Sequence, residues 1–319
     1  MFGESAALDL SVFICGHLRV LAVPNDFVKP APFAYHDPRT LAEACDLLAA
    51  HEDARVLAGG QSLMPMMNFR VAMPDHLIDL NRVAELSYLR WEGEALRVGA
   101  MTHQCDLEFS PDVARRCPIL HEALSHVGHR QTRNRGTFGG SLCHLDPSAE
   151  LVNVTALLGG TLHVASKHGM RDIAFGDFAV GYMTTSLEPH ELLAGVTLPL
   201  PGAGRGHAFV EFARRHGDFA VVACSALLGL DRTGKIADAA LALSGLGHAP
   251  VRPAPIEQAL RGEKPGTIAF KAAAAAAEKL DAMADAYVTS AYRRHLARVL
   301  TYRALEQASA RANDRHETG

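Results

Sequence analysis

The six cysteines of this 319-residue sequence are scattered, and no two of them form a CxxC pair. Iron–sulfur clusters and structural zinc sites need closely grouped thiolates, so the chain is expected to hold neither. Isolated thiols are typical of a reducing compartment, which predicts a cytoplasmic protein whose cysteines act as small buried apolar residues. The cysteines are Cys15, Cys45, Cys105, Cys117, Cys143 and Cys224.

Long runs of one charge or of apolar residues are also missing. The formal net charge is −4 and no stretch is rich in Lys and Arg, so the concentrated basic face that nucleic acid requires is not expected. The apolar stretch from Leu10 to Val23 is interrupted by His17 and Arg19, and it is too short to span a bilayer. It also lacks the features of a signal peptide. We expect residues 1–30 to be an extension ahead of the fold, and we expect no transmembrane segment.

The two commonest nucleotide-binding signatures are absent as well. No Gly-Lys-Ser/Thr sequence is present, so there is no phosphate-binding P-loop. The nearest approach to the dinucleotide motif GxGxxG is formed by Gly202, Gly204 and Gly206, in which the third glycine comes one residue too early. This segment also lies in a Pro-flanked linker. A dinucleotide would therefore have to bind through another fold.

The patterns that are present alternate between extended and helical segments. Apolar runs bounded by turn residues predict strands, and apolar residues at helical spacing predict helices. The predicted strands are 55–58, 76–80, 95–99, 161–165, 192–198, 220–230 and 236–244. One predicted helix begins at Asp37, with Pro38 in its first turn, and the other predicted helices are 119–127, 271–286 and 291–308. The Pro- and Gly-rich segment 199–206 is the predicted linker.

Two glycine-bearing segments are candidate binding loops. Consecutive glycines permit positive φ and carry no Cβ, so backbone N–H groups can converge on an anion, and nearby hydroxyls can add donors. A single Gly-Gly pair is more often only a tight turn, but two such loops favour a shared phosphate ligand. The first loop contains Ala58, Gly59, Gly60, Gln61, Ser62 and Leu63, and the second contains Thr137, Phe138, Gly139, Gly140 and Ser141.

Other candidate sites have simpler interpretations. His121, His126 and His129 do not have the HExxH spacing of zinc peptidases, so we interpret them as surface or supporting histidines and expect no metal site on this chain. His129 could still reach a ligand, because it leads into the second loop. Asp146 and Glu150 could be paired carboxylates, but Asp146 could instead cap a helix whose first residue is Pro147.

Several of these motifs together resemble one protein family. The sequence is similar to the medium, FAD-binding subunits of carbon monoxide dehydrogenase and of related N-heteroaromatic hydroxylases, within the molybdenum hydroxylase (xanthine oxidase) family. The similarity extends from about Phe33 to Ala308, in order and in spacing. The segments that carry it are 58–67, 133–142, 146–150, 181–185, 214–220 and 292–296.

The resemblance implies an α+β fold in two parts. The first part is an FAD-binding domain of the vanillyl-alcohol oxidase (PCMH) type at 31–203, in subdomains of about 31–85 and 86–203. The second is a smaller C-terminal α/β domain of the carbon monoxide dehydrogenase flavoprotein type at 204–319. These boundaries are expectations from the family.

The resemblance also implies the cofactor and its contacts. Non-covalent FAD would lie with its pyrophosphate near both glycine loops and with its adenosine side near Asp146 and Glu150, and Leu193 would be a further contact. Asp218 and Phe219 would lie toward the isoalloxazine. Relatives often have Tyr or Ile in place of Phe219, and some have His in place of Gln61, which makes these two roles less general.

The resemblance finally implies a function. The chain would be the electron-transfer subunit of a heterotrimeric molybdenum hydroxylase, acting as an oxidoreductase only within the complex. Its flavin would receive electrons from two [2Fe–2S] clusters of a small subunit, while a large molybdopterin subunit hydroxylates the substrate. Two heterotrimers would pair. The alternatives are a stand-alone FAD-dependent reductase of the same fold and a non-catalytic assembly module.

Overall fold

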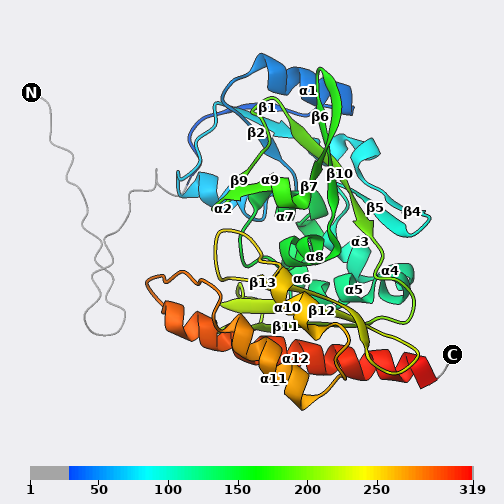
Figure 1. Ribbon diagram of the computed structural model, residues 1–319. Coiled ribbons are helices and arrows are strands. Elements are labelled where there is room, and N and C mark those ends of the chain that lie inside the picture. Colours follow the sequence, from blue (N-terminus) through cyan, green and yellow to red (C-terminus); the bar gives the residue numbers. More distant parts are fainter. Residues whose placement is uncertain (1–28, 318–319) are drawn as a thin grey trace, which may run out of the picture.

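The computed structural model describes residues 29–317, which form three packed units (Figure 1). The predicted N-terminal extension, residues 1–30, lies outside the described residues except for its last two. Within the described part, none of the helices combines the length and apolar character that a membrane crossing requires.

The first unit is a small parallel sheet with one covering helix. Its strands are in the order β1-β3-β2, and both pairs are parallel. The helix begins at Leu41 and not at Pro38, because the Thr40 side chain accepts a hydrogen bond from the N–H of Glu43 and so caps it. The elements are β1 (Ala34–His36), α1 (Leu41–Ala50), β2 (Ala54–Leu57), α2 (Leu63–Asn68), β3 (His76–Asp79), η2 (Leu80–Arg82) and η3 (Ala84–Leu86).

The second unit is an antiparallel sheet covered by short helices. Its five strands are in the order β4-β5-β10-β6-β7. A small hairpin, β8 with β9, lies beside it. The elements are β4 (Leu89–Glu92), β5 (Ala95–Gly99), α3 (Gln104–Glu108), α4 (Pro111–Arg116), α5 (Pro118–Leu124), α6 (Arg130–Arg135), α7 (Phe138–His144), α8 (Glu150–Leu158), β6 (Thr161–Ser166), β7 (Gly169–Ala174), α9 (Phe175–Phe178), β8 (Ala179–Gly181), β9 (Thr184–Thr185) and β10 (Leu192–Pro199).

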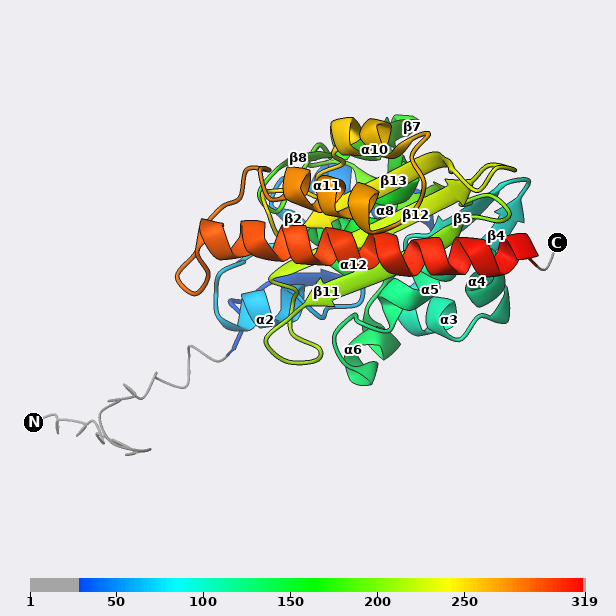
Figure 2. The ribbon, with the colours of Figure 1, turned by 60° about the horizontal axis from the view of Figure 1, so that its bottom comes forward.

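The third unit is an antiparallel sheet backed by helices. Strands β11, β12 and β13 pair in sequence order, and the long helix α12 lies along them beside α11 (Figure 2). Alanines and leucines of α11 and α12 fill the space between helices and sheet. The elements are β11 (Gly206–Phe212), β12 (Val222–Leu230), β13 (Ile236–Ser244), α10 (Ala254–Leu260), α11 (Thr267–Ala277) and α12 (Ser290–Glu317).

Two of the predicted helices are too long at their C-terminal ends. Helix α5 ends at Leu124, before the predicted Val127, and helix α11 ends at Ala277 where the sequence predicted a helix to residue 286. Downstream of α11 the carboxylate of Asp285 accepts hydrogen bonds from the N–H groups of Tyr287 (2.7 Å) and Val288 (2.8 Å). Such local bonds compete with helical bonding, so the chain turns there.

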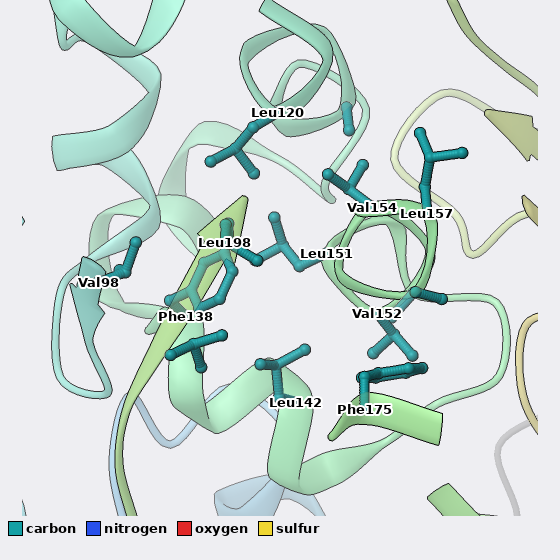
Figure 3. Packing of buried hydrophobic residues seen from close by; sticks show 14 of the residues in the cluster. Val98, Leu120, Phe138, Leu142, Leu151, Val152, Val154, Leu157, Phe175 and Leu198 are labelled. Carbon is teal, nitrogen blue, oxygen red and sulfur yellow. The ribbon is translucent and has the colours of Figure 1, made fainter. Parts of the chain in front are cut away.

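Helix α8 joins the second and third units. Every residue from Glu150 to Leu157 is buried, and side chains of the helix meet α7, α5, β5 and β10 in the central core (Figure 3). On its other side, the amide of Asn153 donates to the carbonyl of Ala242 (3.2 Å) and to the hydroxyl of Ser244 (2.5 Å). The hydroxyl of Ser225 donates to the same Asn153 side chain. These buried bonds fix α8 on β12 and β13.

An acidic group is buried at this junction. Glu150 is only 3% exposed, and burial raises its pKa to about 8, with a further rise from the negative charge of Glu211 on β11. Nδ1 of His126 lies 3.2 Å from Oε1 of Glu211, and this hydrogen bond raises the pKa of His126 against the effect of burial. The folded chain therefore holds protons here that the unfolded chain releases at lower pH.

Substitution Glu150→Gln should weaken the dependence of stability on pH. Because the folded pKa of Glu150 lies above its ordinary value of 4.5, its contribution to stability is complete below that pH and is lost as the pH rises toward about 8. One proton corresponds to at most about 1.4 kcal/mol per pH unit. Gln imitates the neutral acid, so the fall in melting temperature between pH 5 and pH 8 should be smaller in the variant.

The matched control is Glu94→Gln, which changes an exposed glutamate. It should reproduce the wild-type slope of melting temperature against pH. If Glu150→Gln kept the wild-type slope of melting temperature against pH, Glu150 would not be the group that releases a proton when the chain unfolds.

Candidate functional site

The two predicted glycine loops lie directly against each other. A Cβ on Gly59 would lie 2.2 Å from the carbonyl oxygen of Arg135 and 2.8 Å from Cα of Gly136. A Cβ on Gly140 would lie 3.4 Å from Cβ of Ala58 and 2.7 Å from Oγ1 of Thr137. Only glycine at position 59 permits this backbone approach, so the second glycine segment is held against the end of β2.

The first loop presents unused hydrogen-bond donors. Among the described residues, no acceptor receives a hydrogen bond from the backbone N–H groups of Gly59 to Leu63. Gly60 has a φ of +72°, which turns the chain as it leaves the strand. Ser62 precedes α2, but its hydroxyl makes no capping hydrogen bond. Unused N–H groups and a free hydroxyl in one loop form a surface that suits an anion.

Two bonds hold the first loop in shape, and sequence reasoning did not identify the residue that makes one of them. The side-chain amide of Asn81 donates to the carbonyl of Ala58 (3.0 Å), and the backbone N–H of Asn81 donates to Asp79 (2.9 Å). The amide of the exposed residue Gln61 donates to the carbonyl of Gly59 (3.1 Å). Asn81 lies in η2, and no sequence motif marks it.

The second loop differs, because its N–H groups from Phe138 to Ser141 are already used. The N–H of Phe138 donates to Thr102 (2.9 Å), that of Gly139 to Ala100 (2.9 Å), and that of Gly140 to the hydroxyl of Thr137 (3.1 Å). Phe138 is fully buried and packs in the central core beside Leu142 (Figure 3). This loop therefore supports the first loop, and its half-buried members Gly140 and Ser141 are the ones left partly open.

The helix before the second loop is anchored by an ion pair that the sequence did not reveal. Arg133 of α6 donates to both carboxylate oxygens of Glu108, at 2.7 and 2.9 Å, and also to the carbonyl of Val127 (2.8 Å). Both side chains are largely buried. A bidentate pair of this kind fixes the direction in which α6 enters Gly136.

A segment of the third unit reaches the same region. Gly217 has a φ of +88°, and a Cβ there would lie 2.4 Å from the ring of His129, the residue that precedes α6. The next two residues are Asp218, which is half-buried, and Phe219, which is 56% exposed. The structure therefore brings the 217–219 segment against the residue from which α6 leads into the second loop.

Asp146 does not cap the helix that follows it. Helix α8 begins at Glu150 with Ala149 as its N-cap, so Pro147 is not its first residue. Instead, Oδ1 of Asp146 accepts from the N–H of Ser148 (2.8 Å), which closes a local turn before the helix. Glu150 faces Glu211 and His126 within the protein, and Leu193 on β10 is buried in the central core.

The three neighbouring histidines have separate environments. His126 pairs with Glu211, His129 packs on Gly217, and His121 is half-buried on α5. Among the described residues, none of the three belongs to a group of side chains that could share a metal ion.

The described cysteines are free thiols. Burial raises the pKa of Cys117, Cys143 and Cys224 to about 12, so these groups stay protonated at neutral pH and are poor metal ligands. Cys45 is also buried, while Cys105 and Cys143 keep some exposed surface, and Cys15 lies outside the described residues.

Comparisons with known proteins match nearly the whole chain. Residues 31–201 match the family described as the FAD binding domain in molybdopterin dehydrogenase, and residues 207–308 match the CO dehydrogenase flavoprotein C-terminal domain. The chain is 37% identical to the caffeine dehydrogenase subunit beta of Pseudomonas sp. (strain CBB1), over 89% of this chain and 97% of that protein. It is 35% identical to the carbon monoxide dehydrogenase medium chain of Afipia carboxidovorans, over 89% of this chain and 99% of that protein.

Solved structures agree with these matches. A chain of quinoline 2-oxidoreductase from Pseudomonas putida 86 superimposes with a TM-score of 0.86 at 36% identity, covering 89% of this chain and 99% of that one. A chain of the Cu,Mo-CO dehydrogenase superimposes with a TM-score of 0.85 at 35% identity, covering 88% and 99%. The α+β fold implied by the sequence motifs is confirmed. This chain belongs to the FAD-binding medium subunits of the molybdenum hydroxylase family, the oxidoreductases that include carbon monoxide dehydrogenase.

Proposed function

We propose that the first glycine loop holds the pyrophosphate of a non-covalently bound FAD. The observation that carries this proposal is the row of unused N–H groups from Gly59 to Leu63 beside the free hydroxyl of Ser62. Two phosphates need several donors, and the loop supplies such donors from backbone that is already fixed by Asn81 and by the second loop. The residues present therefore fit the cofactor.

The remaining contacts extend from this loop. Gly140 and Ser141 are the open members of the second loop, while Thr137, Phe138 and Gly139 shape it from inside. The half-buried Asp146 is proposed to approach the adenosine side. We retain Ala58, Leu63, Glu150 and Leu193 as predictions from the family resemblance, although the latter two are buried here.

The 217–219 segment is proposed to lie at the isoalloxazine. Support comes from the packing of Gly217 on His129, which carries Asp218 and Phe219 toward the helix that enters the second loop. The exposed ring of Phe219 could cover one face of a flat aromatic group, and Asp218 offers a carboxylate acceptor beside it.

The proposed activity is electron transfer within a multi-subunit molybdenum hydroxylase. Bound FAD supplies chemistry in which one or two electrons are exchanged. The described thiols are isolated and three of them have a pKa raised to about 12, so cluster ligands are proposed to come from another polypeptide. We therefore propose a small [2Fe–2S] subunit and a large molybdopterin subunit as partners, in a dimer of heterotrimers located in the cytoplasm. The relatives are subunits of dehydrogenases named for caffeine and for carbon monoxide, and we propose that the partner subunit selects the substrate.

Substitution Gly59→Ala should weaken retention of FAD. Its Cβ would lie 2.2 Å from the carbonyl of Arg135, and separating the two loops should cost about 1–3 kcal/mol, which corresponds to a loss of affinity of roughly 5- to 150-fold. FAD released by acid from purified protein gives the measurement, and complete release from the wild type also tests non-covalent binding.

Gly176→Ala is the control for this substitution, because a Cβ there would meet nothing within 4 Å. It should retain FAD at the wild-type ratio. Wild-type FAD content in Gly59→Ala would refute the role of the loop contact.

Substitutions of Ser62 and Thr137 should have different effects, one on the affinity for FAD and the other on the stability of the fold. The Ser62 hydroxyl has no capping bond in the protein, so Ser62→Ala should weaken FAD binding by about 1.5 kcal/mol, roughly tenfold, without lowering the melting temperature of the FAD-free chain. Thr137 caps α7, so Thr137→Ala should lower that melting temperature through a loss of about 1 kcal/mol. Isothermal titration with FAD and thermal melts distinguish the two effects. Unchanged affinity in Ser62→Ala would contradict the assignment.

The proposed roles of this chain and of its partner subunits can be tested by purifying the tagged chain from its native host. We expect it to co-purify with molybdenum and with about four iron atoms per FAD, as two [2Fe–2S] clusters would supply. Caffeine, quinoline and carbon monoxide are suitable probes, each added anaerobically to the complex and to the FAD-loaded chain alone.

Only the complex should show bleaching of the flavin absorbance, and only with the probe that is its substrate. Bleaching by any of the probes in the chain alone would overturn the relay and favour the stand-alone reductase. Purification of FAD-loaded chain without iron or molybdenum would equally contradict the proposed partners.

A further inference from the structure

Three histidines of the first unit converge, although they are far apart in the sequence. His36 ends β1, His51 follows α1 directly, and His76 begins β3. All three side chains are half-buried. Because β1 and β3 pair in parallel, with Ala34 opposite His76 and His36 opposite Ile78, the two strands place two of the rings side by side.

The imidazole rings form a compact group. Nε2 of His36 lies 2.9 Å from Nδ1 of His76. The ring of His51 lies over that of His76, with centroids 3.7 Å apart and planes 14° apart, and lies 5.1 Å from that of His36. One nitrogen from each ring can be chosen so that all three lie within 4.8 Å of one another.

We propose that His36, His51 and His76 form a binding site for one zinc-class divalent transition-metal ion. A zinc ion binds histidine nitrogen at about 2.0–2.1 Å in a tetrahedral shell, which places two ligand nitrogens roughly 3.3 Å apart. The observed separations, from 2.9 Å to no more than 4.8 Å, bracket that value. Imidazole suits zinc, copper and nickel, and a fourth position remains for water.

Coordination requires the side chains to turn. Lone pairs lie in the plane of each ring, and the rings of His51 and His76 are stacked, so their lone pairs do not yet meet at one point. The second side-chain torsion of histidine has a broad energy profile, which makes this rotation inexpensive. When the ion binds, the proton that lies between His36 and His76 moves through solvent to the other nitrogen of its own ring, so each ligand remains a neutral imidazole.

The proposed ligands and the candidate FAD loop are different parts of the first unit. His76 begins β3 and His51 precedes β2, so both lie at the amino ends of parallel strands, while His36 ends β1 opposite Ile78 of β3. The first glycine loop leaves the carboxyl end of β2, and none of its residues is a proposed ligand. Metal binding and FAD binding can therefore be measured independently.

The test uses the full-length chain, without a histidine tag, stripped with a chelator and desalted. Zinc chloride is titrated calorimetrically into the wild type, His51→Ala, His36→Gln and the control His168→Ala, which changes an exposed histidine outside the group. Removal of a supporting neighbour of a metal ligand costs about 10–100-fold in affinity, so removal of a ligand should cost at least tenfold. Far-UV circular dichroism and FAD content establish that each variant is folded.

Wild type and His168→Ala should each bind one zinc ion, and a cobalt-loaded wild type should show the strong visible absorption of a four-coordinate ion. His51→Ala and His36→Gln should both lose this affinity and this spectrum while retaining FAD. The proposal would be overturned if the wild type did not bind zinc. It would also be overturned if folded His51→Ala and His36→Gln bound zinc with the wild-type affinity. Loss of affinity in His168→Ala would do the same, because it would place the ion elsewhere.

Discussion

The close approach of backbone at Gly59 and Gly139 is the constraint on which the rest of the candidate site depends. A Cβ at Gly59 would overlap the carbonyl of Arg135, and a Cβ at Gly139 would lie 2.5 Å from that of Ala100. These two contacts lock the first unit to the second and the second loop to its own sheet. Because the loops are positioned by backbone packing, the N–H groups from Gly59 to Leu63 remain open for a ligand.

The third unit is held by polar bonds as well as by apolar packing. Asn153 of α8 binds β12 and β13, and the carboxylate of Glu122 on α5 accepts from the N–H of Phe209 (3.1 Å) and from Arg311 of α12 (2.8 Å). Buried polar groups that are fully bonded specify one arrangement of the packed elements. That arrangement sets the position of Gly217 on His129, and so brings a segment of the last unit against the residue that precedes α6.

The two glycine loops have different tasks, although their sequences are alike. Both contain paired glycines and small hydroxyl residues, and both were predicted to offer backbone N–H groups. The structure leaves those of the first loop open and uses those of Phe138, Gly139 and Gly140 within the protein. The hydroxyl of Thr137 accepts the capping hydrogen bond of α7, whereas the hydroxyl of Ser62 makes no capping bond to α2. A loop motif therefore identifies a region, and hydrogen bonding decides which of its groups can meet a ligand.

Local patterns of sequence determined part of the secondary structure, because apolar periodicity and turn residues act over a few neighbouring positions. The predicted elements are strands β2, β3, β5, β6, β10, β12 and β13 and helices α1, α5, α11 and α12. The remaining strands and most of the short helices were not predicted. Local patterns also determined both glycine loops and, through several motifs in order, the family. The end of α11 at Ala277 and the turn at Asp146 are local features that apolar periodicity did not predict. Tertiary structure alone decided what depends on distant residues, such as the burial of Glu150 and the Arg133–Glu108 pair. The convergence of His36, His51 and His76 was decided in the same way, since separations of 15 and 25 residues in the sequence carry no signal until parallel strands bring them together.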